Sequence, residues 1–173
     1  SNCGVTRKQG TSMSTPIAAG SATLVRQYFM EGFYPRGVRT ATDAFVPTGA
    51  LVKAMLINSA VPMKAVRFAN NSLMQLGLPP DVYQGHGRIK LDEVLRVQSL
   101  GGKTTSNLFV VNNATIKEAE KHVYKLSVPS DSASPIKVTL VWIEPPTTAS
   151  SASIVLHDLD LMIYSQLEKK AFY

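Results

Sequence analysis

The 173-residue sequence lacks the features typical of disulfide-linked, membrane-spanning and nucleic-acid-binding proteins. Its one cysteine, Cys3, cannot form a disulfide within the chain. No apolar run reaches the roughly 18 residues of a membrane-spanning helix, and the first residues lack a signal peptide's charged-then-apolar pattern. The net charge is +6, yet basic residues occur in short groups without interleaved aromatic residues. We therefore expect no membrane span and no nucleic-acid partner, only a solvated basic surface.

Cofactor motifs are also missing. No Cys/His cluster has zinc spacing, and no glycine-rich loop matches a phosphate-binding pattern. We therefore expect that no cofactor is required for the chemistry. With 45% hydrophobic and 17% charged residues, the composition is that of an ordinary globular protein, with either one domain or parts of two.

The most informative stretch is residues 10–20, Gly-Thr-Ser-Met-Ser-Thr-Pro-Ile-Ala-Ala-Gly. It places a turn of small residues and Ser12 before a helix predicted from about Ser12 to Met30, with Pro16 in the first turn, where a missing N–H costs little. The free N–H groups and the positive helix end would face an oxyanion beside Ser12. Ser12 is therefore a candidate nucleophile; the alternative is a serine N-cap on an ordinary buried helix.

These eleven residues resemble the active-serine motif of the subtilisin-like serine proteases (subtilases), with Ser14 in place of the usual alanine. The resemblance implies a parallel-sheet α/β domain, polypeptide substrates, an acyl-enzyme on Ser12 and an extracellular or secretory location. It also implies that Thr11 and Met13 shape the turn. Pro16 and Gly20 would set the helix entry and its close packing.

Two later segments agree with this resemblance. A second helix is predicted from Ala50 to about Ala60, closed by Pro62, followed by a long irregular connection over 63–83. In 84–95 we expect a glycine turn, a short extended piece and a short helix capped by Asp92. This block resembles the end of subtilase catalytic domains, so the resemblance extends, in the right order, from Gly10 to about Leu95.

The partners of Ser12 are absent from this stretch. In the subtilase order the Asp and His precede the serine, but the eleven residues before Ser12 include neither. The asparagine that donates to the oxyanion also lies upstream in the family, and Asn2 is too close to Ser12 to replace it. The resemblance thus implies that residues 1–100 are the C-terminal part of a peptidase domain. Its missing N-terminal part would be a necessary partner, and the chain alone is expected to be inactive.

A base downstream of the serine is the alternative arrangement. The α/β-hydrolases have the order Ser…Asp…His, and His86, His122 and His157 could serve with Asp92 or Asp131. Their nucleophile elbow requires glycine at the position of Ser14, however, and no strand pattern precedes Ser12. Each histidine also has a non-catalytic explanation: one lies in a turn, one at a strand start and one beside an acidic residue.

Beyond a linker at 101–107 the apolar period becomes two. Strand-like runs are predicted at 108–111, 124–128, 136–142 and 159–163, whereas 165–173 lacks the pattern. Residues 101–173 therefore predict an incomplete all-β jelly-roll or sandwich domain, since such domains usually need about 100 residues. A rival hypothesis makes this part a non-catalytic binding module attached to a remnant protease segment.

Two shorter patterns suggest a metal site and glycosylation sites. Asp158 and Asp160 point to one side of a predicted strand and either help to bind a structural Ca²⁺ or form an ordinary solvated face, which is the simpler interpretation. Asn70-Asn71-Ser72 and Asn113-Ala114-Thr115 match the N-glycosylation pattern and lend slight support to a secretory route.

Overall fold

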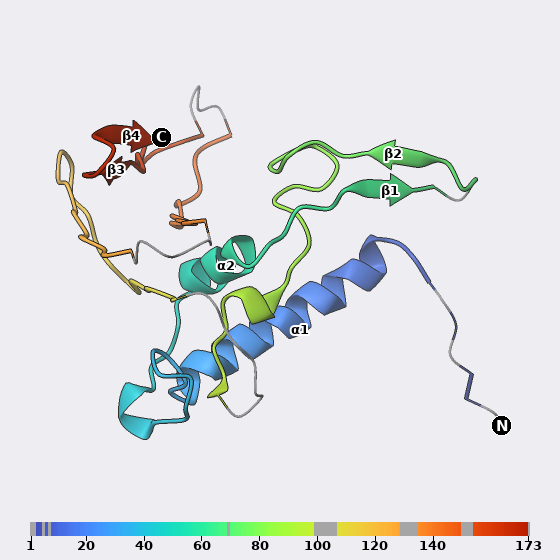
Figure 1. Cartoon of the computed structure of the whole chain (residues 1–173), viewed down its shortest axis with the longest axis horizontal. Helices are drawn as coiled ribbons and strands as arrows, with labels where there is room; N and C mark the ends of the chain where they lie inside the picture. Colours follow the sequence, from blue (N-terminus) through green and yellow to red (C-terminus); the bar gives the residue numbers. More distant parts are fainter. Residues whose placement is uncertain are drawn as a thin grey trace. The chain divides into compact units, whose positions relative to one another are not determined.

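The computed structural model describes residues 3–4, 6, 8–68, 70–98, 107–128, 135–149 and 154–172. The chain divides into two compact units, Ser1–Thr139 and Leu140–Tyr173. The elements are α1 Thr11–Met30, η1 Ala41–Asp43, α2 Gly49–Asn58, β1 Ala65–Arg67, β2 Leu73–Gln75, η2 Leu91–Glu93, β3 Ile163–Ser165 and β4 Lys170–Phe172 (Figure 1). The predicted linker at 101–107 and the boundary at residue 100 lie almost wholly outside the described residues, and this boundary stays a prediction.

Helix α1 confirms the helix predicted from Ser12 to Met30. Its hydroxyl side chains bond back to carbonyls one turn earlier, as from Thr15 Oγ1 to the Thr11 oxygen at 2.9 Å, which satisfies the hydroxyls locally at a slight cost to helix stability. Val25, Tyr28 and Phe29, spaced three and four residues apart, form its buried face. Only the C-terminal half of the helix therefore contributes to the core.

Glycine sets the end of α1. The N–H of Gly32 donates to the Phe29 oxygen at 3.1 Å and the N–H of Phe33 donates to the Tyr28 oxygen at 3.0 Å. Gly32 has φ +70°, and the rings of Phe33 and Tyr28 stack with centroids 5.8 Å apart. This is a Schellman motif with its hydrophobic contact. It turns the chain sharply back toward the core.

Helix α2 packs against α1 and supplies the other side of the core. Its start is capped by Thr48, whose Oγ1 accepts the N–H of Leu51 at 3.1 Å, and it confirms the helix predicted at 50–60. The buried apolar cluster consists of Val25, Tyr28, Phe29, Leu51, Met55 and Val94. Burying each large side chain stabilises the fold by about 1.5–3 kcal/mol.

Residues beyond the linker are tied to this core. Asn112 Oδ1 accepts from the Thr48 N–H at 3.1 Å and from Thr48 Oγ1 at 3.0 Å. Asn112 Nδ2 donates to the Val46 oxygen at 3.3 Å, and the Val110 N–H donates to the Tyr34 hydroxyl at 3.1 Å. The segment around Asn112 therefore holds the capping residue of α2 in place.

Replacing Asn112 with alanine is expected to lower the free energy of unfolding by about 1.5–4.5 kcal/mol, because three hydrogen bonds worth about 0.5–1.5 kcal/mol each are lost. Chemical denaturation of the whole chain measures the change. Asn107→Ala is the matched control, since Asn107 is an exposed amide at the start of the same segment. Equal stability of the two variants would show that the hydrogen bonds of Asn112 contribute nothing to the free energy of unfolding.

The expectation of an irregular connection over 63–83 is wrong in its middle. Strands β1 and β2 pair antiparallel there, with Val66 opposite Met74. Asn71 occupies the left-handed region at φ 65°, which asparagine tolerates better than most residues, so the chain can turn without glycine. Three-residue strands are too short to show a clear alternation in the sequence.

The 84–95 block is confirmed in outline and corrected in one detail. Gly85 and Gly87 have positive φ values, and Arg88 pairs with Val61. The following turn is a 3₁₀ helix that begins at Leu91, with Lys90 rather than Asp92 as its cap residue and no side-chain cap. Asp92 lies inside the turn and faces Lys90 Nζ at 3.5 Å. The expected capping by Asp92 is therefore wrong.

The predicted strand runs after the linker are mostly unpaired in the described part of the chain. Of these residues only Ile163 belongs to a strand, β3, which pairs with β4 so that Tyr164 lies opposite Ala171. Figure 1 draws 107–128 as a coil that doubles back on itself. An isolated hairpin is marginal in water, so alternation alone does not form a ladder. Residues 165–173 lack the alternating pattern and nevertheless contain β4, and the sandwich stays a prediction.

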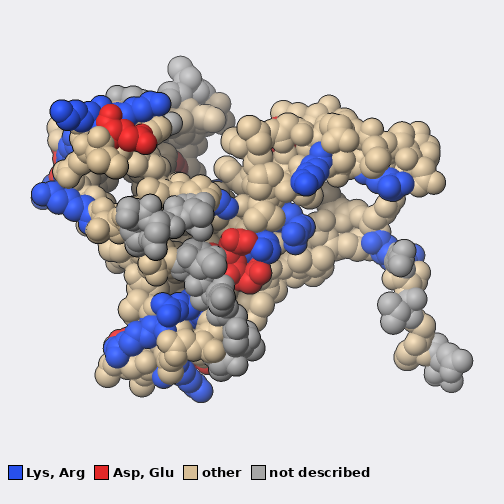
Figure 2. Space-filling model, in the orientation of Figure 1, with Lys and Arg blue, Asp and Glu red and all other residues tan. Residues whose placement is uncertain are grey.

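A small polar cluster lies within the second unit. Glu144 accepts the indole N–H of Trp142 at 2.9 Å and the backbone N–H of His157 at 2.9 Å, and it faces His157 Nδ1 at 2.8 Å. These contacts, with that of Trp142 the largest, hold the pKa of the Glu144 carboxyl below its ordinary value. Glu144 therefore joins Trp142 and His157 through one carboxylate. On the face drawn in Figure 2, lysine and arginine side chains form several separate small groups.

Candidate active site

Ser12 is the second residue of α1, and its side chain is exposed. The helix starts after Gly10, which has φ 139° and so adopts a conformation that side chains disfavour. The Gly10 oxygen accepts the N–H groups of Met13 at 3.0 Å and Ser14 at 3.2 Å. Within the described residues, the N–H groups of Thr11 and Ser12 have no acceptor. They are thus available to an anion at the positive end of the helix.

The position of Pro16 differs from the prediction. Since α1 begins at Thr11, Pro16 lies inside the helix rather than in its first turn. An ordinary residue there would donate its N–H to the carbonyl of Ser12, and proline cannot. The Ser12 carbonyl therefore lacks its usual donor four residues later, and among the described residues the Ser12 N–H has no acceptor. Pro16 is visible in the sequence, but its place inside the helix follows only from the observed start of α1 at Thr11.

The structure joins Ser12 to no base in the described part of the chain. No hydrogen bond or ion pair there connects it with a histidine. His122 contacts Glu120 at 3.3 Å and the Tyr124 hydroxyl at 3.4 Å, and His157 contacts Glu144. His86 lies in the glycine turn, and Asp131 is outside the described residues. The downstream arrangement gains no support from these contacts.

The acidic residues considered for metal binding do not form a metal site in the described part of the chain. The described residues include no group of three or more His, Cys, Asp or Glu side chains arranged to hold a metal ion. Asp158 and Asp160 are both exposed, with Leu159 half-buried between them. Because Ca²⁺ takes six to eight oxygen ligands, two exposed carboxylates are not a site by themselves.

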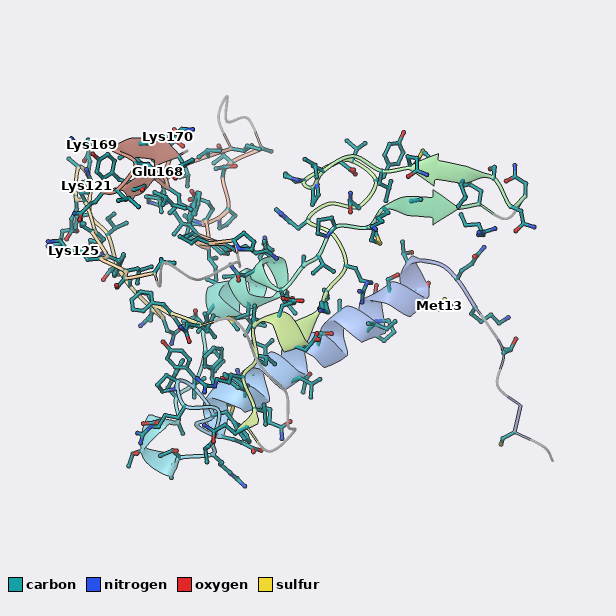
Figure 3. The ribbon with its side chains drawn as sticks, viewed as in Figure 1. Met13, Lys121, Lys125, Glu168, Lys169 and Lys170 are labelled. Carbon is teal, nitrogen blue, oxygen red and sulfur yellow. The ribbon has the colours of Figure 1, made fainter. Side chains whose placement is uncertain are left out.

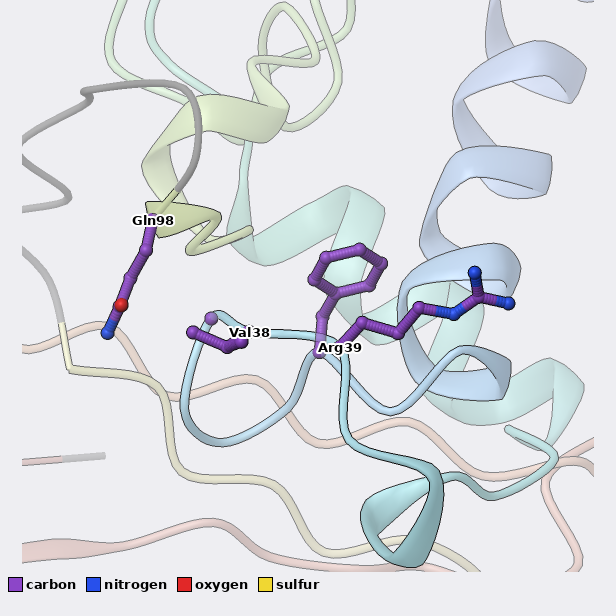
Figure 4. Close-up of a pocket in the computed structure, with 5 residues that line it drawn as sticks. Val38, Arg39 and Gln98 are labelled. Atoms are coloured by element: carbon purple, nitrogen blue, oxygen red, sulfur yellow. The ribbon is translucent and has the colours of Figure 1, made fainter.

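A hollow of about 470 Å³ opens beside the loop that follows α1, and it is lined by Phe33, Gly37, Val38, Arg39 and Gln98 (Figure 4). The lining is mostly apolar, and Arg39 Nε pairs with Glu31 at 3.6 Å. None of the predicted site residues lines it. It lies at the C-terminal end of α1, whereas Ser12 is at the other end.

The helix surface near Ser12 is apolar and open. Ile17 is 67% exposed and Leu24 is 54% exposed, and Met13, labelled in Figure 3 at the free end of α1, is 39% exposed. Small residues Ala18, Ala19 and Gly20 lie between them, and a Cβ added to Gly20 would meet nothing within 4 Å. This half of the helix lacks the cover that its composition predicts.

Comparison with known proteins agrees with the motif. The model of the subtilase family matches residues 1–110. Among curated relatives from Dictyostelium discoideum, "Serine protease/ABC transporter B family protein tagD" is 29% identical over 193 residues, covering 96% of this chain. The tagB protein of the same description is 26% identical and covers 89% of this chain.

This chain spans only 11% of the tagD protein and 10% of the tagB protein. No solved structure matches it. In the part of the chain that the structure describes, no helix has the length and apolar character needed to cross a membrane. Since the family model covers more than half of the residues, including all of Gly10 to Gly20, the chain belongs to the subtilase family, the subtilisin-like serine proteases.

Proposed function

We propose that this chain carries the nucleophile of a serine endopeptidase. Ser12 Oγ attacks the carbonyl carbon of a peptide bond, and water later hydrolyses the acyl-enzyme. The observation that carries the proposal is the exposed Ser12 at the start of α1, within the motif of a subtilase. Its free N–H supplies one donor for the oxyanion.

The base, its orienting carboxylate and the second oxyanion donor come, in this proposal, from a part of the protein N-terminal to Ser1. Three observations support this. No histidine bonds to Ser12 among the described residues, the apolar half of α1 is uncovered, and the relatives are far longer than this chain. Without that part the hydroxyl keeps its proton, because its own pKa is far above neutral. The chain alone is therefore inactive.

The finer assignments are proposals of the same kind. The substrates are polypeptides, and the protein acts outside the cytoplasm, as the family resemblance implies. Residues 101–173 belong to a β-sandwich, supported by their alternating pattern and by the β3–β4 hairpin. A structural Ca²⁺ at Asp158 and Asp160 stays a prediction, and no step of the reaction uses it.

A fluorophosphonate probe, which phosphonylates only an activated serine, tests the proposal. We expect labelling of Ser12 in the full-length protein and none in the 173-residue chain. Peptide mapping of the labelled serine identifies the site. Labelling of the short chain that disappears in a His86→Ala, His122→Ala or His157→Ala variant would overturn the upstream base. A full-length protein that is not labelled at Ser12 would overturn the proposal itself.

A further inference from the structure

The turn between β1 and β2 presents one of the two glycosylation motifs at its tip. The Phe68 N–H donates to the Ser72 oxygen at 2.9 Å, and the Asn71 N–H donates to the Phe68 oxygen at 2.9 Å. Asn71 has φ 65°. These bonds close a tight turn that includes Asn70 and the left-handed Asn71 and that joins the antiparallel strands β1 and β2 (Figure 1).

Within this turn the two essential side chains of the motif contact each other. Asn70 Oδ1 accepts the Ser72 hydroxyl at 2.6 Å and the Ser72 N–H at 3.0 Å. A hydrogen bond to the amide oxygen polarises the amide and makes its N–H more acidic. Among the described residues, Asn70 Nδ2 has no acceptor. The amide nitrogen is thus free while its oxygen is held.

The surroundings leave room for a bulky group. Asn70, Asn71 and Ser72 are all exposed, as are the flanking apolar side chains of Phe68 at 47% and Leu73 at 57%. A glycan is large and solubilising, so it fits a surface turn and would cover exposed apolar area. Because the contacts are local, they can form in the nascent hairpin before the rest of the chain folds.

We propose that Asn70 is an N-glycosylation site. The amide nitrogen of Asn70 forms a bond to the anomeric carbon of an N-acetylglucosamine, losing one proton. The bond from that carbon to the phosphate oxygen of a lipid-linked pyrophosphate oligosaccharide breaks, and the lipid pyrophosphate leaves. The secretory pathway of a eukaryotic cell supplies this donor. The inference rests on the proposed extracytoplasmic location and not on peptidase activity.

The second motif provides an internal comparison. Asn113 is exposed and left-handed at φ 59°, but no hydrogen bond joins it to Thr115 in the described residues. Its neighbour Asn112 is the tie to Thr48. Removing this motif with Asn113→Gln leaves Asn70 as the one acceptor sequence, so a single assay reports on a single asparagine.

The test is translation of the full 173-residue chain, carrying Asn113→Gln and a cleavable secretory leader, in the presence of microsomes. We expect one glycan, seen as a slower band that endoglycosidase returns to the unmodified position. Asn70→Gln and Ser72→Ala should abolish the band, whereas Asn71→Gln and Ser72→Thr should retain it. Because the leader delivers the chain, this outcome is independent of catalysis and of the protein's own route.

An unmodified chain, or a band that persists in Asn70→Gln, overturns the assignment. Loss of the band in Asn71→Gln as well as in Asn70→Gln would also overturn the assignment. The loss would then reflect a disturbed turn and would not identify Asn70 as the modified residue. Mass spectrometry of the full-length protein from its own cells completes the test. A glycan at Asn70 there supports both the site and the extracytoplasmic route. Bare Asn70 there, with modification in microsomes, overturns the site as a natural modification while leaving peptidase activity untouched.

Discussion

Ser12→Ala in the full-length protein is expected to abolish peptidase activity while leaving folding unchanged. The variant loses the attacking oxygen, which no neighbouring group replaces. The loss in kcat should approach about 10⁶-fold, a magnitude carried over from subtilisin itself rather than derived from this chain. The KM should change little, because the hydroxyl contributes to chemistry more than to binding. Steady-state hydrolysis of a fluorogenic peptide by both proteins measures the two constants.

Ser14→Ala is the matched control for this experiment. Ser14 is an exposed serine two residues later in the same helix, and its hydroxyl bonds only to the Gly10 oxygen at 3.3 Å in the described structure. Alanine is also the usual subtilase residue at that position. This variant should retain most of the kcat. Equal losses in both variants would show that the helix start, and not the Ser12 hydroxyl, was disturbed.

Gly32→Ala is expected to lower the free energy of unfolding by about 2–5 kcal/mol, combining about 1–2 kcal/mol of left-handed strain with about 1–3 kcal/mol of overpacking. Gly32 has φ +70°, and a Cβ there would lie 1.9 Å from the Thr40 oxygen, a backbone atom that cannot move aside easily. The Schellman motif at the end of α1 would have to open. Urea denaturation followed by circular dichroism measures the loss.

Gly49→Ala separates this effect from a general cost of replacing glycine. Gly49 is the first residue of α2, and an added Cβ meets nothing within 4 Å. Alanine is a better helix former by about 1 kcal/mol, so this variant should be neutral or slightly stabilised. If Gly32→Ala unfolds at the same urea concentration as Gly49→Ala, the steric argument at Gly32 is wrong.

The two α-helices and the C-terminal end of α1 were predictable from the sequence, and the sheets were not. The spacing of Val25, Tyr28 and Phe29 and the glycine after Met30 indicated α1, because helical contacts are local. β1 and β2 are three residues long, so their pairing depends on Asn71 in the turn rather than on a repeating pattern. The alternation at 136–142 predicted a strand, but alternation does not supply a partner strand.

At the candidate site, the sequence names the candidate residue but not its environment. The motif gives Ser12 as the candidate nucleophile because it resembles the active-serine segment of the subtilases. The helix start one residue before Ser12, which moves Pro16 out of the first turn, depends on Gly10 adopting φ 139°. A sequence pattern does not report a dihedral angle. It also did not reveal that Asn112, far along the chain, steadies the cap of α2.

Because α1 is buried at only one end, its resistance to local opening is uneven along its length. The turns around Val25 and Phe29 can open only when the core opens, so they share the global free energy of unfolding. The turns around Ser12 have no such anchor, and Pro16 removes one rung of their hydrogen-bond ladder. Fraying therefore begins at the end that carries the nucleophile. A surface that covers Ile17 and Leu24 would raise the cost of that fraying and order the serine in the same event.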